Sequence, residues 1–239
     1  MLLLAALAST LSCTQASREE PVRVVAAASL GPALSPILEA WSEDTQHTSA
    51  LSTAGTPRLV SQLQAGAPAD LVLTADPTWM QVLVDEGLVV EPQLLLTNSL
   101  VLVVPVQSSV RTLSELQGPI ALAGEQVPAG RYAEQALRAE GLWASLSPQA
   151  RRGDNVRTVL AWVSRGEVNA AVVYGSDAHG NPDVRVLHSF PPEAHAPIEI
   201  WAAKTPQAQD HGLLSLLMEP GGQAHFVAAG FSSPSLAAP

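Results

Sequence analysis

The chain has 239 residues and a formal net charge of -10, from 22 acidic and 12 basic side chains. This balance offers no basic surface for a phosphate backbone and excludes nucleic acid and anionic membrane surfaces as partners. Hydrophobic residues make up 47% of the chain and aromatic ones only 4%, so the core is mainly Ala, Val and Leu, as in folds that interleave strands and helices. The single cysteine, Cys13, rules out an intramolecular disulfide and a cysteine-based metal cage.

The first twelve residues are apolar or small and carry no charge. The run is shorter than the roughly 20 apolar residues of a membrane span, so residues 1–16 are predicted to be a leader that directs export. Leu11-Ser12-Cys13 resembles the lipobox of bacterial lipoproteins, in which the cysteine carries the lipid. Thr14-Gln15-Ala16 offers a small-x-small cleavage site instead, and the sequence leaves open whether Cys13 is lipidated or removed.

The first predicted unit is strand, turn and helix. Residues 22–27 form the apolar run of a buried parallel strand, and Ser29 with Gly31-Pro32 marks the turn into the helix. Pro36 predicts that the first firm turn of this helix lies near Ser35. The apolar residues of the helix recur at helical spacing and are expected to be buried: Leu34, Ile37, Leu38 and Trp41.

The second predicted helix begins with Thr56 as its cap and Pro57 in its first position. The next strand covers residues 71–74, and Asp76 caps a helix that runs from Pro77 to about Gly87. This β-α-β-α rhythm predicts an α/β fold.

A second unit repeats the pattern after residue 100. Asp154 is predicted to cap a helix with Val156 in its first turn. Two α/β units linked by strands that cross between them would place a ligand in the cleft, where strands end and helices begin. The predicted strands are 100–104, 120–123, 170–174, 184–187 and 197–203, and helices are expected over 129–140, from 156 to Gly166, and after about Gln207.

Ser29, Thr56 and Val156 share one context, since each lies where a helix starts. Helix starts carry unpaired backbone N–H groups and the positive end of the helix dipole, which suits an anion. Each residue alone is typical of an ordinary cap or first turn, so only their convergence would make a site.

Catalytic motifs are absent from the sequence: it has no nucleophile elbow, phosphate loop or H-E-x-x-H pattern. The six histidines include no i, i+4 pair that could hold a metal from one helix face. Asp177 and His179 could form an acid–base pair in a hydrolase or transferase acting on phosphorylated substrates, but their position before Gly180-Asn181-Pro182 favours a turn.

Several phrases of the sequence resemble, in order, the periplasmic molybdate-binding proteins of ABC transporters. The resemblance covers about residues 22–204. It rests on Ala26-Ala27-Ala28-Ser29-Leu30, Gln64-Ala65-Gly66-Ala67-Pro68-Ala69-Asp70, Ala75-Asp76 with Trp79-Met80, Asn98-Ser99-Leu100-Val101, Val127-Pro128-Ala129-Gly130-Arg131-Tyr132-Ala133 and Val173-Tyr174-Gly175-Ser176-Asp177-Ala178.

The resemblance implies a two-lobed type II periplasmic binding protein fold, in which each lobe is a mixed sheet flanked by helices and two segments cross between the lobes. Lobe 1 would comprise residues 21–98 and 198–239, and lobe 2 residues 99–197. The implied function is a receptor, not an enzyme, that has no cofactor and holds molybdate or tungstate through the oxygens of the anion. The residues carried over from the family motifs are Ser29, Thr56, Ala129, Val156 and Tyr174.

The resemblance further implies a monomer in the periplasm or another extracytoplasmic compartment that delivers its ligand to a membrane permease. It would touch the membrane only through a lipid on Cys13. Thr56-Pro57 departs from the family serine at this position and leaves sulfate or another tetrahedral anion open as the ligand. Ile200-Trp201 and Gly124-Glu125 depart from the Tyr-Pro and Gly-Asp that are commoner in relatives. A sensor without a transport role would use the same pocket.

Overall fold

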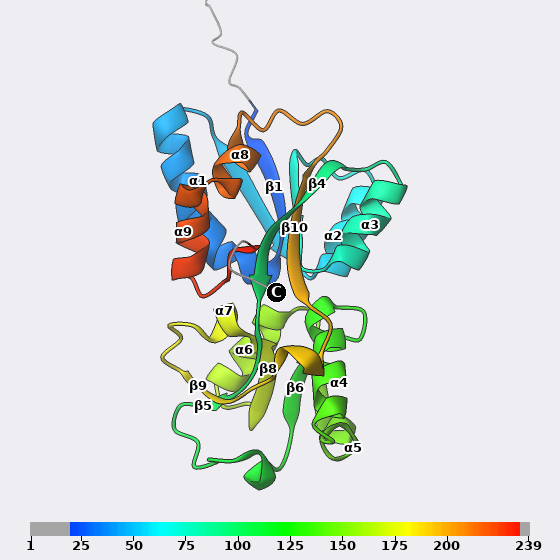
Figure 1. Cartoon of the computed structure of the whole chain (residues 1–239), viewed down its shortest axis with the longest axis vertical. Helices are drawn as coiled ribbons and strands as arrows, with labels where there is room; N and C mark the ends of the chain where they lie inside the picture. Colours follow the sequence, from blue (N-terminus) through cyan, green and yellow to red (C-terminus); the bar gives the residue numbers. More distant parts are fainter. Residues whose placement is uncertain (1–19, 235–239) are drawn as a thin grey trace, which may run out of the picture.

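The computed structural model describes residues 20–234 and arranges them around two five-stranded sheets, one in each half of the molecule (Figure 1). The predicted leader 1–16, with Cys13, lies outside the described residues. The strand orders are β2-β1-β3-β10-β4 and β7-β6-β8-β5-β9. Both sheets contain parallel and antiparallel pairs, which confirms the predicted two-lobed α/β fold. The strands are β1 (Val22–Ala27), β2 (Ser49–Ala54), β3 (Leu71–Thr74), β4 (Val90–Asn98), β5 (Leu100–Pro105), β6 (Ile120–Ala123), β7 (Ala150–Gly153), β8 (Ala170–Tyr174), β9 (Val184–Ser189) and β10 (Ile198–Lys204).

The chain passes from the first sheet to the second between β4 and β5 and returns between β9 and β10. β4 and β10 lie side by side as an antiparallel pair where these crossings begin and end. Ser232 forms an isolated bridge with Thr97, so the end of the described chain returns to the same place. We propose to divide the chain at the crossings, with residues 21–98 and 198–239 as lobe 1 and residues 99–197 as lobe 2.

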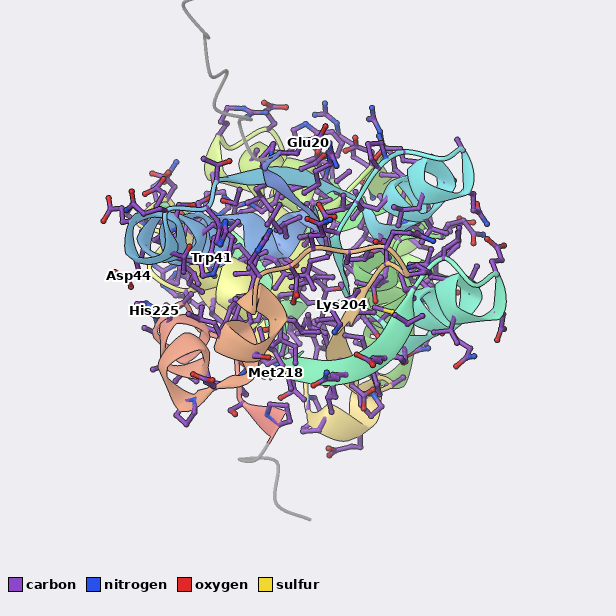
Figure 2. All side chains as sticks on the ribbon, turned by 90° about the horizontal axis from the view of Figure 1, so that it is seen from above. Glu20, Trp41, Asp44, Lys204, Met218 and His225 are labelled. Atoms are coloured by element: carbon purple, nitrogen blue, oxygen red, sulfur yellow. The ribbon has the colours of Figure 1, made fainter. Side chains whose placement is uncertain are left out.

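Helices cover both faces of each sheet. In lobe 1, α1, α8 and α9 cover one face and α2 and α3 the other (Figure 1). Seen from above, Trp41 of α1 and His225 of α9 lie to one side of the sheet, while Lys204 at the end of β10 lies near its middle (Figure 2). The helices are α1 (Gly31–Thr45), α2 (Thr56–Gln64), α3 (Pro77–Asp85), α4 (Pro128–Ala139), α5 (Trp143–Leu146), α6 (Val156–Ser164), α7 (Gly175–Ala178), α8 (Leu213–Met218) and α9 (Pro220–Ala228), with 3-10 turns at Ala28–Leu30, Leu113–Glu115, Ser147–Gln149 and Pro192–Ala194.

The predicted apolar stripe of α1 is buried against the sheet of lobe 1. The prediction that this helix becomes firm only near Ser35 is wrong, because α1 already begins at Gly31. Pro32 supplies a φ suited to a helix start. Pro36 lies only one turn further, where its missing N–H forgoes a single hydrogen bond to the carbonyl of Pro32.

Several strands of both lobes lead directly into helices at the edge of the sheet that faces the other lobe. In lobe 1, β1, β2 and β3 continue into η1 (Ala28–Leu30), α2 and α3. In lobe 2, β6, β7 and β8 continue into α4, α6 and α7. The carboxyl ends of parallel strands meet at one edge of a sheet, so the helix starts of both lobes gather at the cleft. None of the helices in residues 20–234 has the length and hydropathy of a membrane span.

Candidate functional site

The five residues singled out in the sequence line one cavity between the lobes. The cavity is small: the centre of a water-sized sphere can occupy only about 10 Å³ of it, far less than the roughly 300–1,000 Å³ of pockets for drug-sized ligands, so it suits only a small ligand such as an ion. Ser29 has a relative exposure of 6% and the other four residues 4% or less. The five are Ser29, Thr56, Ala129, Val156 and Tyr174.

Lobe 1 contributes Ser29 and Thr56 to the cavity. Ser29 lies in the short 3-10 turn that connects β1 to α1. The prediction that Thr56 caps α2 is wrong: Gly55 is the N-cap and Thr56 is the first helical residue. Its hydroxyl accepts a hydrogen bond from the backbone N–H of Ala75 at 3.5 Å, which leaves the hydroxyl proton free to be donated into the cavity.

Lobe 2 contributes Ala129 and Val156 through the starts of two helices. Ala129 is the second residue of α4, and Val156 is the first residue of α6. The predicted cap Asp154 lies one residue too early. Asn155 caps α6, since its Oδ1 accepts a hydrogen bond from the Thr158 N–H at 2.9 Å. Val156 therefore lies at the N-terminal end of α6, where its N–H points out of the helix.

Four backbone N–H groups in this cavity are available to a ligand. The first residues of a helix have no carbonyl one turn earlier to accept from their N–H groups. Among residues 20–234, the N–H groups of Ser29, Thr56, Ala129 and Val156 meet no acceptor. The positive ends of the dipoles of α2, α4 and α6 add to this, so the cavity combines unpaired donors with a favourable potential for an anion.

Tyr174, at the end of β8, supplies a phenol to the same cavity. The phenol oxygen is buried and has no hydrogen-bond partner within the described residues. Burial, reinforced by the nearby Tyr132, Asp177 and Asp76, raises the pKa of Tyr174 well above 10. The phenol therefore keeps its proton and can act as a donor at neutral pH. A buried O–H without a partner is costly, and a bound acceptor would relieve that cost.

The lining of the cavity carries no charged side chain among the described residues. An anion held there would be neutralised by aligned hydrogen-bond donors rather than by a counter-charge. Within residues 20–234 no group of three or more His, Cys, Asp or Glu side chains is placed to hold a metal ion. Besides the five site residues, the lining consists of Ala27, Ala28, Gly55, Ala75, Val127, Pro128 and Asn155.

Residues 22–232 match a family described as bacterial extracellular solute-binding proteins. The chain is 36% identical over 208 residues to the molybdate-binding protein ModA of Escherichia coli (strain K12), covering 82% of this chain and 81% of the relative. It is 33% identical over 190 residues to ModA of Haemophilus influenzae, covering 74% and 75%. The chain belongs to the ModA family.

Solved structures share the fold of this ModA-family chain. The periplasmic molybdate-binding protein of Azotobacter vinelandii superposes with a TM-score of 0.78 at 19% identity, over 89% of this chain and 99% of that one. The substrate-binding domain of a molybdenum ABC transporter from Clostridium difficile gives a TM-score of 0.70 at 27% identity, over 89% and 98%. A sulfate-binding protein of Mycobacterium tuberculosis, SubI, gives 0.72 at 15% identity, over 91% and 88%, so the fold by itself does not select the anion.

The acid–base pair considered for Asp177 and His179 is not formed in this ModA-family chain. Asp177 is buried and its Oδ1 accepts a hydrogen bond from Arg157 at 3.3 Å, whereas His179 is exposed. The expected turn at Asp177 is the short helix α7. Burial raises the pKa of Asp177 to about 6, and Arg157 opposes this shift.

One contact between the lobes was missed in the sequence. Asp76 does cap α3 as predicted, through its Oδ1 and the Trp79 N–H at 2.9 Å. Its Oδ2 also forms an ion pair with Arg131 of α4, across the cleft. Arg131 lies in one of the segments that carry the family resemblance, Val127-Pro128-Ala129-Gly130-Arg131-Tyr132-Ala133. The sequence does not show, however, that the starts of two distant helices meet in the fold.

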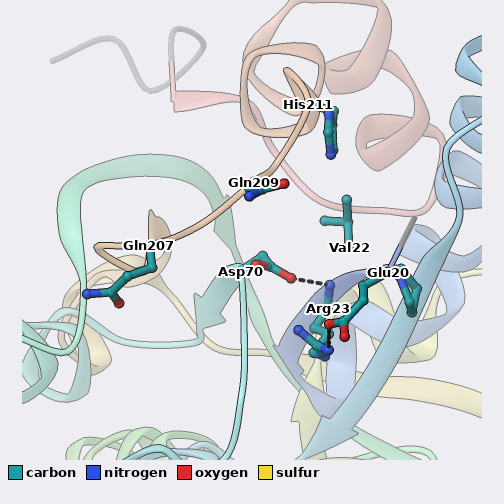
Figure 3. A pocket seen from close by; sticks show the side chains of 8 residues that line it. Glu20, Val22, Arg23, Asp70, Gln207, Gln209 and His211 are labelled. Carbon is teal, nitrogen blue, oxygen red and sulfur yellow. Dashed lines mark hydrogen bonds and ion pairs between the residues drawn. The ribbon is translucent and has the colours of Figure 1, made fainter. Parts of the chain in front are cut away.

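A separate pocket lies at the opposite edge of the lobe 1 sheet, beside the start of β1 (Figure 3). Asp70 there accepts a hydrogen bond from the backbone N–H of Arg23 at 2.7 Å, and Arg23 forms an ion pair with Glu20. Arg23 and Glu20 thus pair with each other, Asp70 accepts from a backbone N–H, and the carboxylates of this pocket do not favour an anion.

Proposed function

We propose that this chain is an extracytoplasmic receptor that binds molybdate or tungstate between its lobes and delivers it to the membrane permease of an ABC transporter. The observation that carries the proposal is a cavity with several unpaired donors and no charged side chain. Membership of the ModA family supports molybdate as the ligand.

A dianion can be bound without a cation when enough aligned donors replace its water. Each hydrogen bond to a charged group contributes roughly 1.5–3 kcal/mol. The hydroxyls of Ser29, Thr56 and Tyr174 and the N–H groups at the helix starts supply such donors. Because these groups donate and need only acceptors from the ligand, the fully deprotonated tetrahedral oxyanion is the form that fits.

The same donors discriminate against hydrogen phosphate. Its proton needs an acceptor, and an unpaired donor in a dry site costs roughly 1–3 kcal/mol. Sulfate carries no such proton, so size must exclude it: its shorter bonds do not span the donors of both lobes at once. Thr56 has one methyl group more than a serine would have, and this difference leaves sulfate open as the ligand. Sulfate is therefore the competitor to include in a test.

The receptor acts without a catalytic step and without a cofactor in this proposal. Asp177, the acid of the enzymatic alternative, forms its ion pair with Arg157 and not with His179, and this supports a receptor over a hydrolase or transferase. We infer a monomer exported by the leader 1–16, attached to the membrane only if Cys13 carries a lipid.

The test is titration calorimetry of residues 17–239 with molybdate, tungstate, sulfate and phosphate in turn. We expect one-to-one binding of molybdate and tungstate, with a rise in the melting temperature that follows the ligand concentration, and no heat from phosphate. Tight binding of sulfate alone would replace the proposed ligand. Silence with all four anions would refute the proposed function.

A further inference from the structure

An ion pair within lobe 2 connects the elements that carry two of the proposed ligand contacts. The Nη1 of Arg157 on α6 donates to Oδ1 of Asp177 on α7 at 3.3 Å. Arg157 directly follows Val156, which contributes its backbone N–H to the cavity, and Asp177 is the third residue after Tyr174. Neither charged residue lines the cavity. The pair therefore joins the supports of two donors without lining the space in which an anion would be held.

The segment that follows Tyr174 is also held by the crossing between the lobes. The Gly175 N–H donates to the backbone carbonyl of Ser99 at 2.8 Å. The side-chain amide of Asn98 donates to the Ser176 hydroxyl at 2.8 Å, and the Ser176 N–H donates to Asn98 Oδ1 at 3.3 Å. These bonds fix the start of α7 to the crossing between β4 and β5. They do not reach α6, whereas the ion pair does.

The geometry of the ion pair is a poor source of stability. The Asp177 side chain is completely buried, and its Oδ2 has no hydrogen-bond partner within residues 20–234. Arg157 is 42% exposed, so water screens its attraction for the carboxylate. Burial accordingly outweighs Arg157 and raises the pKa of Asp177 to about 6. A buried charge that is only partly compensated adds little to folding, and a role in the geometry of the site accounts for it better.

We propose that Arg157 and Asp177 are positioning residues whose ion pair fixes the start of α6 against the end of β8, so that the Val156 N–H and the Tyr174 phenol meet one oxyanion together. This inference rests on the proposed function, since it concerns the same ligand. Donors that are fixed in advance lose less freedom on binding than donors that the ligand must order. Because both residues belong to lobe 2, the pair does not depend on the approach of lobe 1.

Charge alone predicts a different result from positioning. Asp177 is close enough to raise the pKa of the Tyr174 phenol, so its carboxylate would repel a bound dianion, and Arg157 would attract it. If the residues acted only through charge, Asp177→Asn would bind molybdate more tightly and Arg157→Gln more weakly. If the pair only stabilised the fold, affinity would follow stability. If the pair positions the donors, both substitutions weaken binding.

The experiment measures molybdate affinity by calorimetry and the stability of the unliganded protein by denaturant unfolding, both at pH 8. The variants are Asp177→Asn, Arg157→Gln, Arg157→Lys, the double variant Asp177→Asn/Arg157→Gln, and Asp177→Asn in a Tyr174→Phe background. Arg165→Gln is the matched control, because Arg165 lies at the other end of α6 and pairs with Glu167 at 2.6 Å.

We expect the dissociation constant for molybdate to rise about tenfold in Asp177→Asn and in Arg157→Gln, between the small effects of exposed ion pairs and the large effects of buried ones. Stability should move in opposite directions: Asp177→Asn removes a buried charge and gains stability, whereas Arg157→Gln leaves that charge without its partner and loses stability. Arg157→Lys should restore part of the affinity, and Arg165→Gln should match wild type.

The two combined variants test the coupling directly. The double variant Asp177→Asn/Arg157→Gln should bind no more weakly than either single variant, because each substitution already removes the pair. In the Tyr174→Phe background, Asp177→Asn should weaken binding by less than about threefold, because one of the two donors that the pair aligns is then missing.

The outcomes separate the positioning role from the proposed function. Wild type that binds molybdate, together with an Asp177→Asn variant that binds equally or more tightly, refutes positioning and leaves the receptor intact. A full tenfold loss from Asp177→Asn in the Tyr174→Phe background also refutes it. Wild type that binds neither molybdate nor tungstate refutes the proposed function, and the positioning role with it.

Discussion

The buried phenol of Tyr174 gives the sharpest prediction about the site. In Tyr174→Phe the ring remains and only the hydroxyl is removed, so the packing of the surrounding core is conserved. The phenol oxygen has no partner within the described residues. The substitution therefore removes no hydrogen bond from the unliganded protein, but it removes one donor from the proposed anion complex.

The magnitude follows from the strength of a hydrogen bond to a charged group. A loss of roughly 1.5–3 kcal/mol corresponds to an affinity for molybdate that is about 10- to 150-fold lower. The melting temperature of the unliganded protein should not fall, because a buried O–H without a partner does not stabilise the fold. A change of about 1 kcal/mol would move the melting temperature by roughly 2–4 °C in a chain of this size, so the measurement resolves this difference.

The assay combines titration calorimetry with thermal melting in the presence and absence of molybdate. The chain has only two tyrosines, and the other one is a matched control. Tyr132 is buried to a similar extent, at 4% exposure, but does not line the cavity. Tyr132→Phe should leave molybdate affinity within about twofold of wild type. Equal affinity of Tyr174→Phe and wild type, or equal losses in the two variants, would refute the assignment of the phenol.

Three further substitutions test other parts of the reasoning. Ser29→Ala removes a hydroxyl donor and keeps the backbone N–H, so calorimetry should show molybdate affinity at least about tenfold lower; unchanged affinity would contradict the placement of Ser29. A Cβ at Gly55 would lie 2.4 Å from the Asp154 carbonyl in the other lobe, so Gly55→Ala should weaken binding by obstructing closure while the unliganded melting temperature stays the same. Burial raises the pKa of Asp177 from 3.8 to about 6; the stability this group contributes is complete below pH 4 and is lost as the pH rises through 6. In denaturant unfolding, the gain in stability from Asp177→Asn should therefore be larger at pH 8 than at pH 3.5, by about 3 kcal/mol, and equal gains at both pH values would contradict the shift.

The sequence predicted the central strands and the edge strand β9, and missed the other three edge strands. β3, β6 and β8 are buried throughout, β1 is buried except for Arg23, and all four appear as mainly apolar runs. The strands that were not predicted, β2, β4 and β7, all lie at the edge of a sheet. An edge strand is covered on fewer sides, so it tolerates polar residues such as Arg151 and Arg152 of β7 and loses the apolar pattern.

The starts of α2, α3 and α6 could be located from the sequence to within one residue, but the caps of α2 and α6 could not. Thr56 and Asp154 have good capping side chains, yet Gly55 and Asn155 occupy the cap positions. The choice depends on backbone angles at the end of the preceding strand, which neighbouring Ser, Thr, Asp, Asn and Gly residues can all adopt. For an anion site the exact cap position matters, because it decides which backbone N–H groups point out of the helix.

The meeting of the site residues across the cleft could be expected only from the family resemblance. Helix starts such as those at Thr56 and Val156 are a hundred residues apart in the chain, and periodicity says nothing about their separation in space. The ion pair of Asp76 with Arg131 was missed for the same reason. Its carboxylate already had a local role as a cap, and the second role depends on the closure of one lobe on the other.

The chain as a whole is acidic, with a net charge of -10, yet its best-supported ligand is an anion. The conflict is only apparent, because exposed charges are screened over a Debye length of about 8 Å at physiological ionic strength, whereas the donors of the cavity act at contact distance. A cavity without a cationic side chain can also be more selective, because a cationic side chain would attract phosphate and sulfate alike. In the proposed site, donors fixed at helix starts on both lobes would instead recognise the size and protonation state of the oxyanion, and would do so only when the lobes are closed. On this argument the contacts that hold the lobes together contribute to selectivity as well as to affinity.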